Sequence, residues 1–219
     1  MSEPLATATA GEPPAPNPEF AVLATAERIA AAARALGAHG MDALVVPTGQ
    51  EARRAVLERL PDGAEVFNNT SRTLEAIGVA EDIERTGRYR PTRLALYQMD
   101  RQMQAKEMRK LGASPDHVVG SAHAVTEDGS LLVASASGSQ LGPLASGASR
   151  VVLVVGGQKI VPDIATGLRR IHEYCYPLEN ERALRAYGVP SGVNNVLIVT
   201  RVLAPERVTV ILVGEVLGF

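Results

Sequence analysis

The chain is poor in cysteine and in aromatic residues, and each scarcity excludes a class of site. Cys175 is the only cysteine among 219 residues, so neither a disulfide framework nor a cysteine-based zinc or iron–sulfur site can form within one chain. The four histidines show no metal-ligand spacing. Aromatic residues make up 4% of the chain and the formal net charge is −2, which argues against a basic, stacking surface for nucleic acid. We therefore expect no metal, no cofactor and no nucleic-acid partner.

Long hydrophobic runs are also missing. The longest apolar stretch, residues 151–155, is much too short to cross a bilayer, and the N-terminus lacks the basic start and apolar segment of a secretory signal. We expect no membrane span and a cytoplasmic protein. Residues 1–18 contain five prolines among small residues, which predicts a disordered tail. Residues 19–219 show no linker or internal repeat, so they are expected to form a single domain.

Short apolar segments alternate with amphipathic ones along residues 19–219. The segments expected to be strands are residues 43–46, 64–67, 116–120, 130–134, 150–155, 196–199 and 208–213. Helical patterns lie between most of them. Pro162 is well placed in the first turn of the next helix, which repeats Ile164, Leu168, Ile171 and Cys175 on one face. Residues 94–97 fit either a strand or a turn of helix. This alternation is typical of an α/β protein with a mostly parallel sheet.

Two loops after expected strands have the composition of anion sites. Asn69, Thr70 and Ser71 stand at a helix start, where free backbone N–H groups favour phosphate or carboxylate, although an ordinary N-cap explains them as well. Gly156 and Gly157 follow the strongest strand, and Lys159 behind them could meet a phosphate. No dinucleotide or P-loop motif is present, so a tight turn with an exposed lysine is an equal alternative.

A third candidate is the segment of residues 124–129, which we expect to be a loop between two strands. Thr126 and Glu127 precede an Asp-Gly pair, and a partly shielded Glu127 carboxylate could act as a nucleophile or general base. His123 adjoins this loop and is the nearest proton-transfer partner. A plain hairpin turn would leave Glu127 solvated. Ser137, Gly138, Ser139 and Gln140 could line a pocket with polar groups or form a flexible loop.

Several of these segments together resemble the lactate-utilisation (LUD) domain family. Residues 70–78 resemble its S-x-T-L-x-E-I-G stretch, and residues 120–129 resemble its G-x-x-N-A-I-T-E-D-G. Residues 150–161 and 210–219 are similar to the family's K-x-V-I-V-V-V-G-x-x-K-I-V and to its C-terminal sequence. The resemblance extends over about residues 40–219 with the motifs in order.

The resemblance implies a three-layer α/β/α sandwich, as in the CoA-transferase and ribose-5-phosphate-isomerase superfamily. It also implies a role in converting L-lactate to pyruvate beside iron–sulfur or oxidase-like subunits. In related CoA-transferases a glutamate in a similar turn attacks an acyl-CoA, and Glu127 matches it by position. The chain departs from the family at His123, which replaces an asparagine, and at Ser139 and Gln140, which replace Asn-Arg. It also lacks a cysteine-rich insertion, so an iron–sulfur role is not expected.

Three functions follow as hypotheses. In the first, the protein is a non-redox LUD protein that binds a small anionic metabolite, a carboxylate or a phosphate, through Asn69, Thr70, Ser71, Thr126, Ser137, Gly138, Ser139, Gln140, Gly156, Gly157 and Lys159. In the second, it is an acyl-CoA transferase or hydrolase with Glu127 as nucleophile and His123 as its partner. In the third, it is an assembly subunit without ligand chemistry.

Overall fold

The structure is a computed structural model that describes residues 14–204 and 206–219. Of the disordered tail expected over residues 1–18, residues 1–13 lie outside the described residues. Pro18 begins the 3-10 helix η1 (Pro18–Ala21), and Asn17 is its N-cap. The backbone N–H of Asn17 donates to the Glu173 carbonyl at 2.8 Å, and its side-chain amide donates to the Glu173 carboxylate at 3.0 Å. Asn17 and η1 are therefore attached to the helix that carries Glu173.

Six parallel strands form the central sheet in the described part of the chain. Their spatial order is β1 (Asp42–Val46), β10 (Val208–Val213), β7 (Arg150–Gly156), β4 (His117–Gly120), β2 (Glu65–Asn68) and β3 (Arg90–Pro91). In β7 and β10, at the middle of this sheet, nearly every side chain is buried. Strands buried on both faces have continuous apolar sequences, which is why both segments were expected to be strands and residues 150–155 were the strongest of them.

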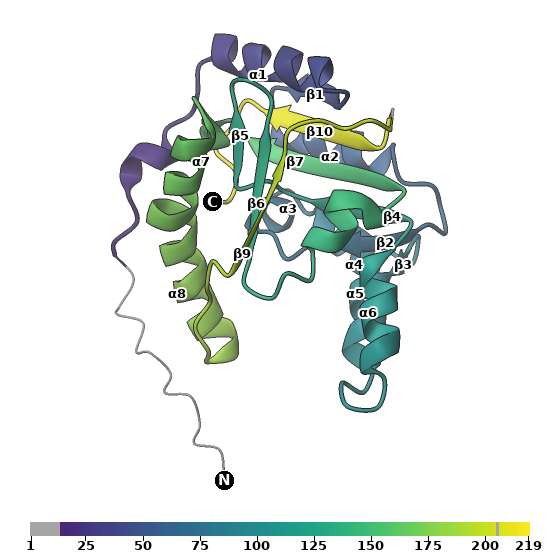
Figure 1. Ribbon diagram of the computed structural model, residues 1–219. Coiled ribbons are helices and arrows are strands. Elements are labelled where there is room, and N and C mark those ends of the chain that lie inside the picture. Colours follow the sequence, from purple (N-terminus) through teal and green to yellow (C-terminus); the bar gives the residue numbers. More distant parts are fainter. Residues whose placement is uncertain (1–13, 205) are drawn as a thin grey trace.

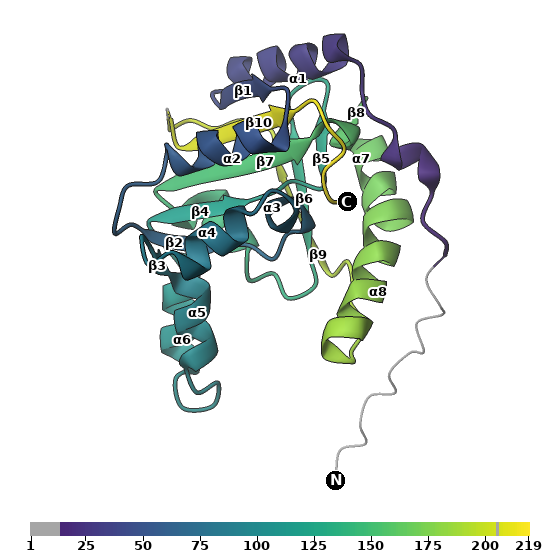
Figure 2. The same cartoon turned by 180° about the vertical axis from the view of Figure 1, so that it is seen from behind.

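The two faces of the sheet pack against different partners (Figures 1 and 2). Val152 and Val154 of β7 point toward α2, α3 and α4, whereas Val151, Leu153 and Val155 point toward α1 and a second sheet. The helices are α1 (Ala26–Ala38), α2 (Gly49–Leu57), α3 (Arg72–Ala76), α4 (Val79–Arg85), α5 (Thr92–Gln98), α6 (Ala105–Ala113), α7 (Ile164–Arg170) and α8 (Tyr176–Tyr187), with the 3-10 turn η3 (Gly157–Lys159) and the π turns η2 (Pro143–Gly147) and η4 (Ile171–Cys175). The expected three-layer α/β/α sandwich is confirmed.

The second sheet is smaller and mixed, and the sequence did not separate its strands from those of the central sheet. Its order is β8 (Ile160–Val161), β5 (Ala124–Thr126), β6 (Leu131–Ser135) and β9 (Asn195–Val199). The β5–β8 pair is parallel and the other two pairs are antiparallel. α7 and η4 cover its far face, where Ile164, Leu168 and Ile171 pack against Leu132 and Ala134. This is the apolar face expected for the helix after Pro162.

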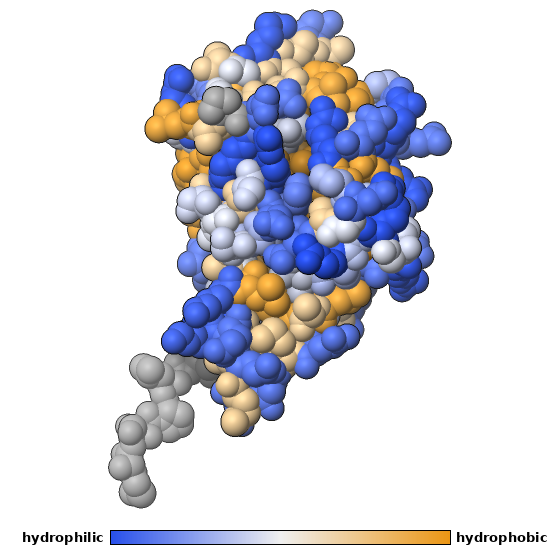
Figure 3. Space-filling view, turned by 90° about the vertical axis from the view of Figure 1, so that its right-hand side faces the viewer, coloured by the Kyte–Doolittle hydropathy of each residue, from blue (hydrophilic) through white to orange (hydrophobic). Residues whose placement is uncertain are grey.

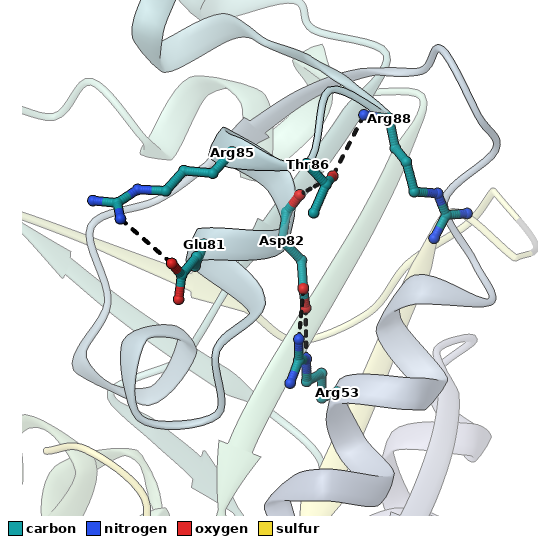
Figure 4. A network of polar contacts seen from close by, with 6 residues as sticks. All are labelled: Arg53, Glu81, Asp82, Arg85, Thr86 and Arg88. Atoms are coloured by element: carbon teal, nitrogen blue, oxygen red, sulfur yellow. Dashed lines mark hydrogen bonds and ion pairs between the residues drawn. The ribbon is translucent and has the colours of Figure 1, made fainter.

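Polar contacts join helices α2 and α4 on their face of the central sheet (Figure 4). Arg53 of α2 donates two hydrogen bonds of 2.6 Å to the Asp82 carboxylate of α4, and Thr86 donates to the Asp82 carbonyl.

Charged and polar side chains cover most of the side of the molecule shown in Figure 3, with apolar residues in small separate groups. None of the described helices combines the length and apolar character needed to span a membrane.

The structure corrects two local expectations and decides a third that was open. Ala124–Thr126 is strand β5 rather than loop, because its backbone pairs with both β6 and β8. The ambiguous residues 94–97 lie in helix α5. Pro162 precedes the helix instead of entering its first turn, since Asp163 is the N-cap and its carboxylate accepts a 2.7 Å hydrogen bond from Thr166 N–H.

Candidate functional site

A cavity of about 340 Å³ lies where the segments that follow β2, β4 and β7 meet the second sheet and α8. The carboxyl ends of parallel strands share one edge of a sheet, and ligands of open α/β sheets bind there. Eight of the residues expected to bind a ligand or act in catalysis line it: Asn69, Thr70, Ser71, His123, Ser137, Ser139, Gln140 and Lys159. Five do not line it: Thr126, Glu127, Gly138, Gly156 and Gly157.

Lys159 ends the turn that follows β7, and its side chain is buried rather than exposed, with 1% of the residue accessible. Its Nζ donates to Thr73 Oγ1 at 2.9 Å and to Ser121 Oγ at 3.1 Å. In residues 14–204 and 206–219 no carboxylate forms an ion pair with it. Burial, and next the charge of Arg170, lower the pKa of Lys159 to about 7.

Arg170 is a second buried cation, and nothing in the sequence pattern indicated it. It stands at the end of α7, where the helix widens into the π turn η4, and it is 0% exposed. Its guanidinium donates to the carbonyl oxygens of His123 and Phe20 and to Cys175 Sγ. It too lacks an ion-pair partner in the part of the chain that the structure describes. Two buried cations without a buried carboxylate make this region electropositive.

His123 is neutral in this surrounding. Burial, followed by the charges of Lys159 and Arg170, lowers its pKa to about 3. Its Nδ1 accepts a hydrogen bond of 3.1 Å from the Ala134 N–H, so the single ring proton is on Nε2. The ring therefore offers the cavity a donor, and a protonated His123 is not present near neutral pH.

Asn69 carries an unsatisfied amide at the cavity wall. The residue is 4% exposed, and neither its Nδ2 nor its Oδ1 has a hydrogen-bond partner among the described residues. Its side chain lies over Gly120, where a Cβ would come within 2.7 Å of Asn69 Nδ2. A buried amide without partners costs about 1–3 kcal/mol per group, so a ligand that pairs with it gains that amount. Ser71 is an ordinary N-cap, since its Oγ accepts from Leu74 N–H at 3.3 Å.

The segment with Ser137 and Gln140 is a hydrogen-bonded turn. Ser137 Oγ and Ser139 Oγ are 2.9 Å apart, and the backbone N–H of Gly138, which has a φ of +76°, donates to Ser135 Oγ at 2.9 Å. The Gln140 amide donates to the Ala134 carbonyl at 2.9 Å. This turn forms one wall of the cavity with its serine hydroxyls on the lining.

Glu127 follows β5 in the turn of the β5–β6 hairpin and does not line the cavity. Its carboxylate accepts a hydrogen bond of 2.6 Å from Arg28 Nε of α1, and 38% of its side chain is exposed. Thr126 Oγ1 accepts from the Ser130 N–H at 2.8 Å and donates to the Asp128 carboxylate, which closes the turn. These contacts are those of a plain hairpin turn, with a solvated carboxylate held by an arginine.

We expect the Glu127→Gln substitution to leave ligand binding in the cavity within twofold of the wild type. It removes a half-exposed ion pair, which contributes at most about 1 kcal/mol to stability. Calorimetric titration and urea denaturation of the two proteins check both values. A loss of binding of tenfold or more would return Glu127 to the list of ligand-contacting residues.

Gly156 and Gly157 allow close packing of the protein on itself. A Cβ on Gly156 would lie 2.3 Å from Gln158 Oε1 and 2.7 Å from the Leu217 nitrogen, and one on Gly157 would meet Leu23 and Ile29. Gln158 in turn donates to the Leu217 carbonyl at 3.0 Å. The residues before Phe219, which lines the cavity, are thereby fixed against the end of β7.

The Gly156→Ala substitution is expected to lower the free energy of unfolding by about 1–3 kcal/mol, because the added methyl group must displace the backbone near Leu217. Gly142→Ala is the matched control, since a Cβ there meets nothing within 4 Å and the backbone is helical. Urea denaturation of both variants measures the difference. Equal stability of the two would contradict the tight packing at Gly156.

Residues 14–204 and 206–219 contain no group of three or more histidine, cysteine, aspartate or glutamate residues arranged to hold a metal ion.

Among known proteins, the family model described as the LUD domain matches residues 29–213. The chain is also similar to the crystal structure of a DUF162 family protein from Deinococcus radiodurans, with 14% sequence identity and a TM-score of 0.53 over 88% of this chain and 99% of that one. At this identity the likeness shows the fold alone. No curated protein matches the chain.

Proposed function

Because this chain belongs to the LUD-domain family, we propose that it is a non-redox component of lactate or related organic-acid utilisation that binds a small carboxylate- or phosphate-bearing ligand beside Lys159. The observation that carries the proposal is the buried Lys159 amine at the cavity, which has no carboxylate partner among the described residues. An uncompensated buried ammonium is costly, and an anionic ligand removes that cost by supplying the missing charge.

The rest of the lining supports a small polar anion. The Asn69 amide has no hydrogen-bond partner among the described residues, the His123 ring carries its proton on Nε2, and Ser121 places a hydroxyl at Lys159. The charge of Arg170 adds to the attraction from behind the His123 carbonyl. A cavity of about 340 Å³ is at the low end of ligand pockets, which fits a three-carbon acid or a small phosphate ester.

The acyl-CoA transferase hypothesis needs a free carboxylate facing the ligand. Glu127, which it names, does not line the cavity and is paired with Arg28, so this function is not proposed. Association with iron–sulfur or oxidase-like subunits remains a separate proposal that follows from the family resemblance. Co-purification with such subunits tests it.

Calorimetric titration of the wild-type protein with L-lactate and with inorganic phosphate tests the proposed function. L-Lactate stays fully ionised from pH 6 to pH 9, so its affinity reports the charge of Lys159. We expect saturable binding whose affinity falls about tenfold per pH unit above pH 7, since each bound anion then requires uptake of one proton by the amine. Sodium chloride at matched ionic strength is the control. Absence of saturable binding for both anions at every pH would make the proposal wrong.

A further inference from the structure

The hydrogen bonds around Lys159 orient its amine in a particular way. The Thr73 hydroxyl donates to the Leu217 carbonyl at 3.1 Å, and the Ser121 hydroxyl donates to the Ala122 carbonyl at 3.2 Å. With their single hydrogens committed, both hydroxyl oxygens act toward Lys159 as acceptors. A neutral amine has two hydrogens, and these two acceptors engage both of them. The nitrogen lone pair then takes the remaining tetrahedral position, toward which no group among the described residues donates a hydrogen bond.

We propose that Lys159 is also a nucleophile that forms a reversible imine with a small anion bearing a carbonyl group, of which a 2-oxo acid is the simplest example. This inference rests on the proposed function, because the same cavity must first hold the anion. Its basis is geometric: a buried amine at the cavity wall, two hydroxyl acceptors on its hydrogens, and no carboxylate among the described residues to hold it as an ammonium.

The reaction balances with the groups present. The Nζ lone pair forms a bond to the carbonyl carbon, and the π electrons of the carbonyl move to its oxygen. The two amine hydrogens pass to that oxygen as protons, the carbon–oxygen bond breaks, and water leaves as the carbon–nitrogen double bond forms. No oxidant, reductant or second substrate is consumed. Addition of water reverses the sequence and releases the ligand.

Protonation and charge favour the same step. Burial lowers the pKa of Lys159 to about 7, so about half of the amine is neutral at pH 7, whereas an exposed lysine is almost wholly protonated. The Asn69 amide and the His123 Nε2–H can hold the carboxylate of the ligand while the carbonyl meets Nζ.

Reductive trapping tests the inference on the wild-type protein. The protein is incubated with pyruvate and cyanoborohydride at pH 7, and the modified residue is located by peptide mass mapping. Lys106 and Lys110, the other two lysines, are exposed and serve as internal controls. We expect a single carboxyethyl adduct at Lys159, formed at least about tenfold faster than at either control lysine, saturating with pyruvate and slowed by L-lactate.

The outcomes separate the inference from the proposed function. If L-lactate binds and pyruvate leaves no adduct at Lys159, the nucleophile inference is wrong and the binding function stands. Equal modification of all three lysines also overturns the inference, since it would reflect only solution chemistry. If no anion binds and no adduct forms, both are wrong.

Discussion

Replacing Lys159 with methionine is expected to abolish anion binding and, at pH 7, to raise the free energy of unfolding by on the order of 3 kcal/mol. Methionine has nearly the volume and flexibility of the lysine stem, and it removes an amine that is charged in the unfolded chain but disfavoured as an ammonium in the fold. A gain in stability together with a loss of function is the mark of a buried binding group.

The effect depends on pH with a definite sign. The pKa of Lys159 is lowered from about 10.5 to about 7 in the folded protein, so the unfolded chain binds more protons between these values. Below pH 7 the buried ammonium lowers the free energy of unfolding of the wild type by its full amount. This loss becomes smaller as the pH rises toward 10.5. The stability advantage of Lys159→Met is therefore largest at pH 7 and below, and it narrows as the pH rises to 9.5.

Urea denaturation of the two proteins at pH 6.5, 8 and 9.5 measures this difference. Lys110→Met is the matched control, because it removes the same side chain from an exposed position. A Lys159→Met protein that is less stable than the wild type at all three pH values would mean that the ammonium is compensated in the fold.

The Gly129→Ala substitution is expected to lower the free energy of unfolding by about 3 kcal/mol, which combines two physical effects. Gly129 has a φ of +89°, and a Cβ there would lie 2.6 Å from the Ala35 carbonyl carbon and 2.8 Å from the Leu36 nitrogen of α1. The Gly129 carbonyl is also 3.2 Å from His39 Nδ1. The hairpin tip is thus pressed against backbone that cannot move aside easily.

Gly63→Ala is the control for the backbone effect alone. Gly63 has a φ of +75°, but a Cβ there meets nothing within 4 Å. Gly63→Ala should therefore lower the free energy of unfolding by about 1 kcal/mol. Thermal and urea denaturation of both variants give the difference due to the close approach between the hairpin and α1. Equal losses for the two variants would contradict this packing.

The sequence predicted local features of the chain where the structure of a segment depends mainly on its own residues. The apolar runs of β7 and β10 predicted strands correctly, because strands covered on both faces exclude polar residues. The Thr-Glu-Asp-Gly segment forms the plain hairpin turn that was one of its two expected structures, since Asp128 and Gly129 meet the conformational needs of such a turn. Ser71 as an N-cap is a similar case.

The site could be predicted only in part. Asn69 and Lys159 were selected because they follow expected strands, and His123 because it adjoins residues 124–129. All three line one cavity at the carboxyl edge of the parallel sheet. Whether Lys159 is exposed or buried, and whether Glu127 faces a ligand or Arg28, depends on which layer lies opposite. The burial of Arg170, the last residue of α7 before the π turn η4, has no signature in the sequence.

The α/β class, the principal strands and the loops that could form a site follow from the amino-acid sequence, because periodicity and turn chemistry act within a few residues. Which of those loops share a cavity depends on the tertiary structure, since Lys159 is buried at the cavity whereas Glu127 lies in a hairpin turn paired with Arg28. Burial of Lys159 by the surrounding layers and the charge of Arg170 lower the pKa of its amine. This lowered pKa makes Lys159 the chemically distinctive residue of the protein.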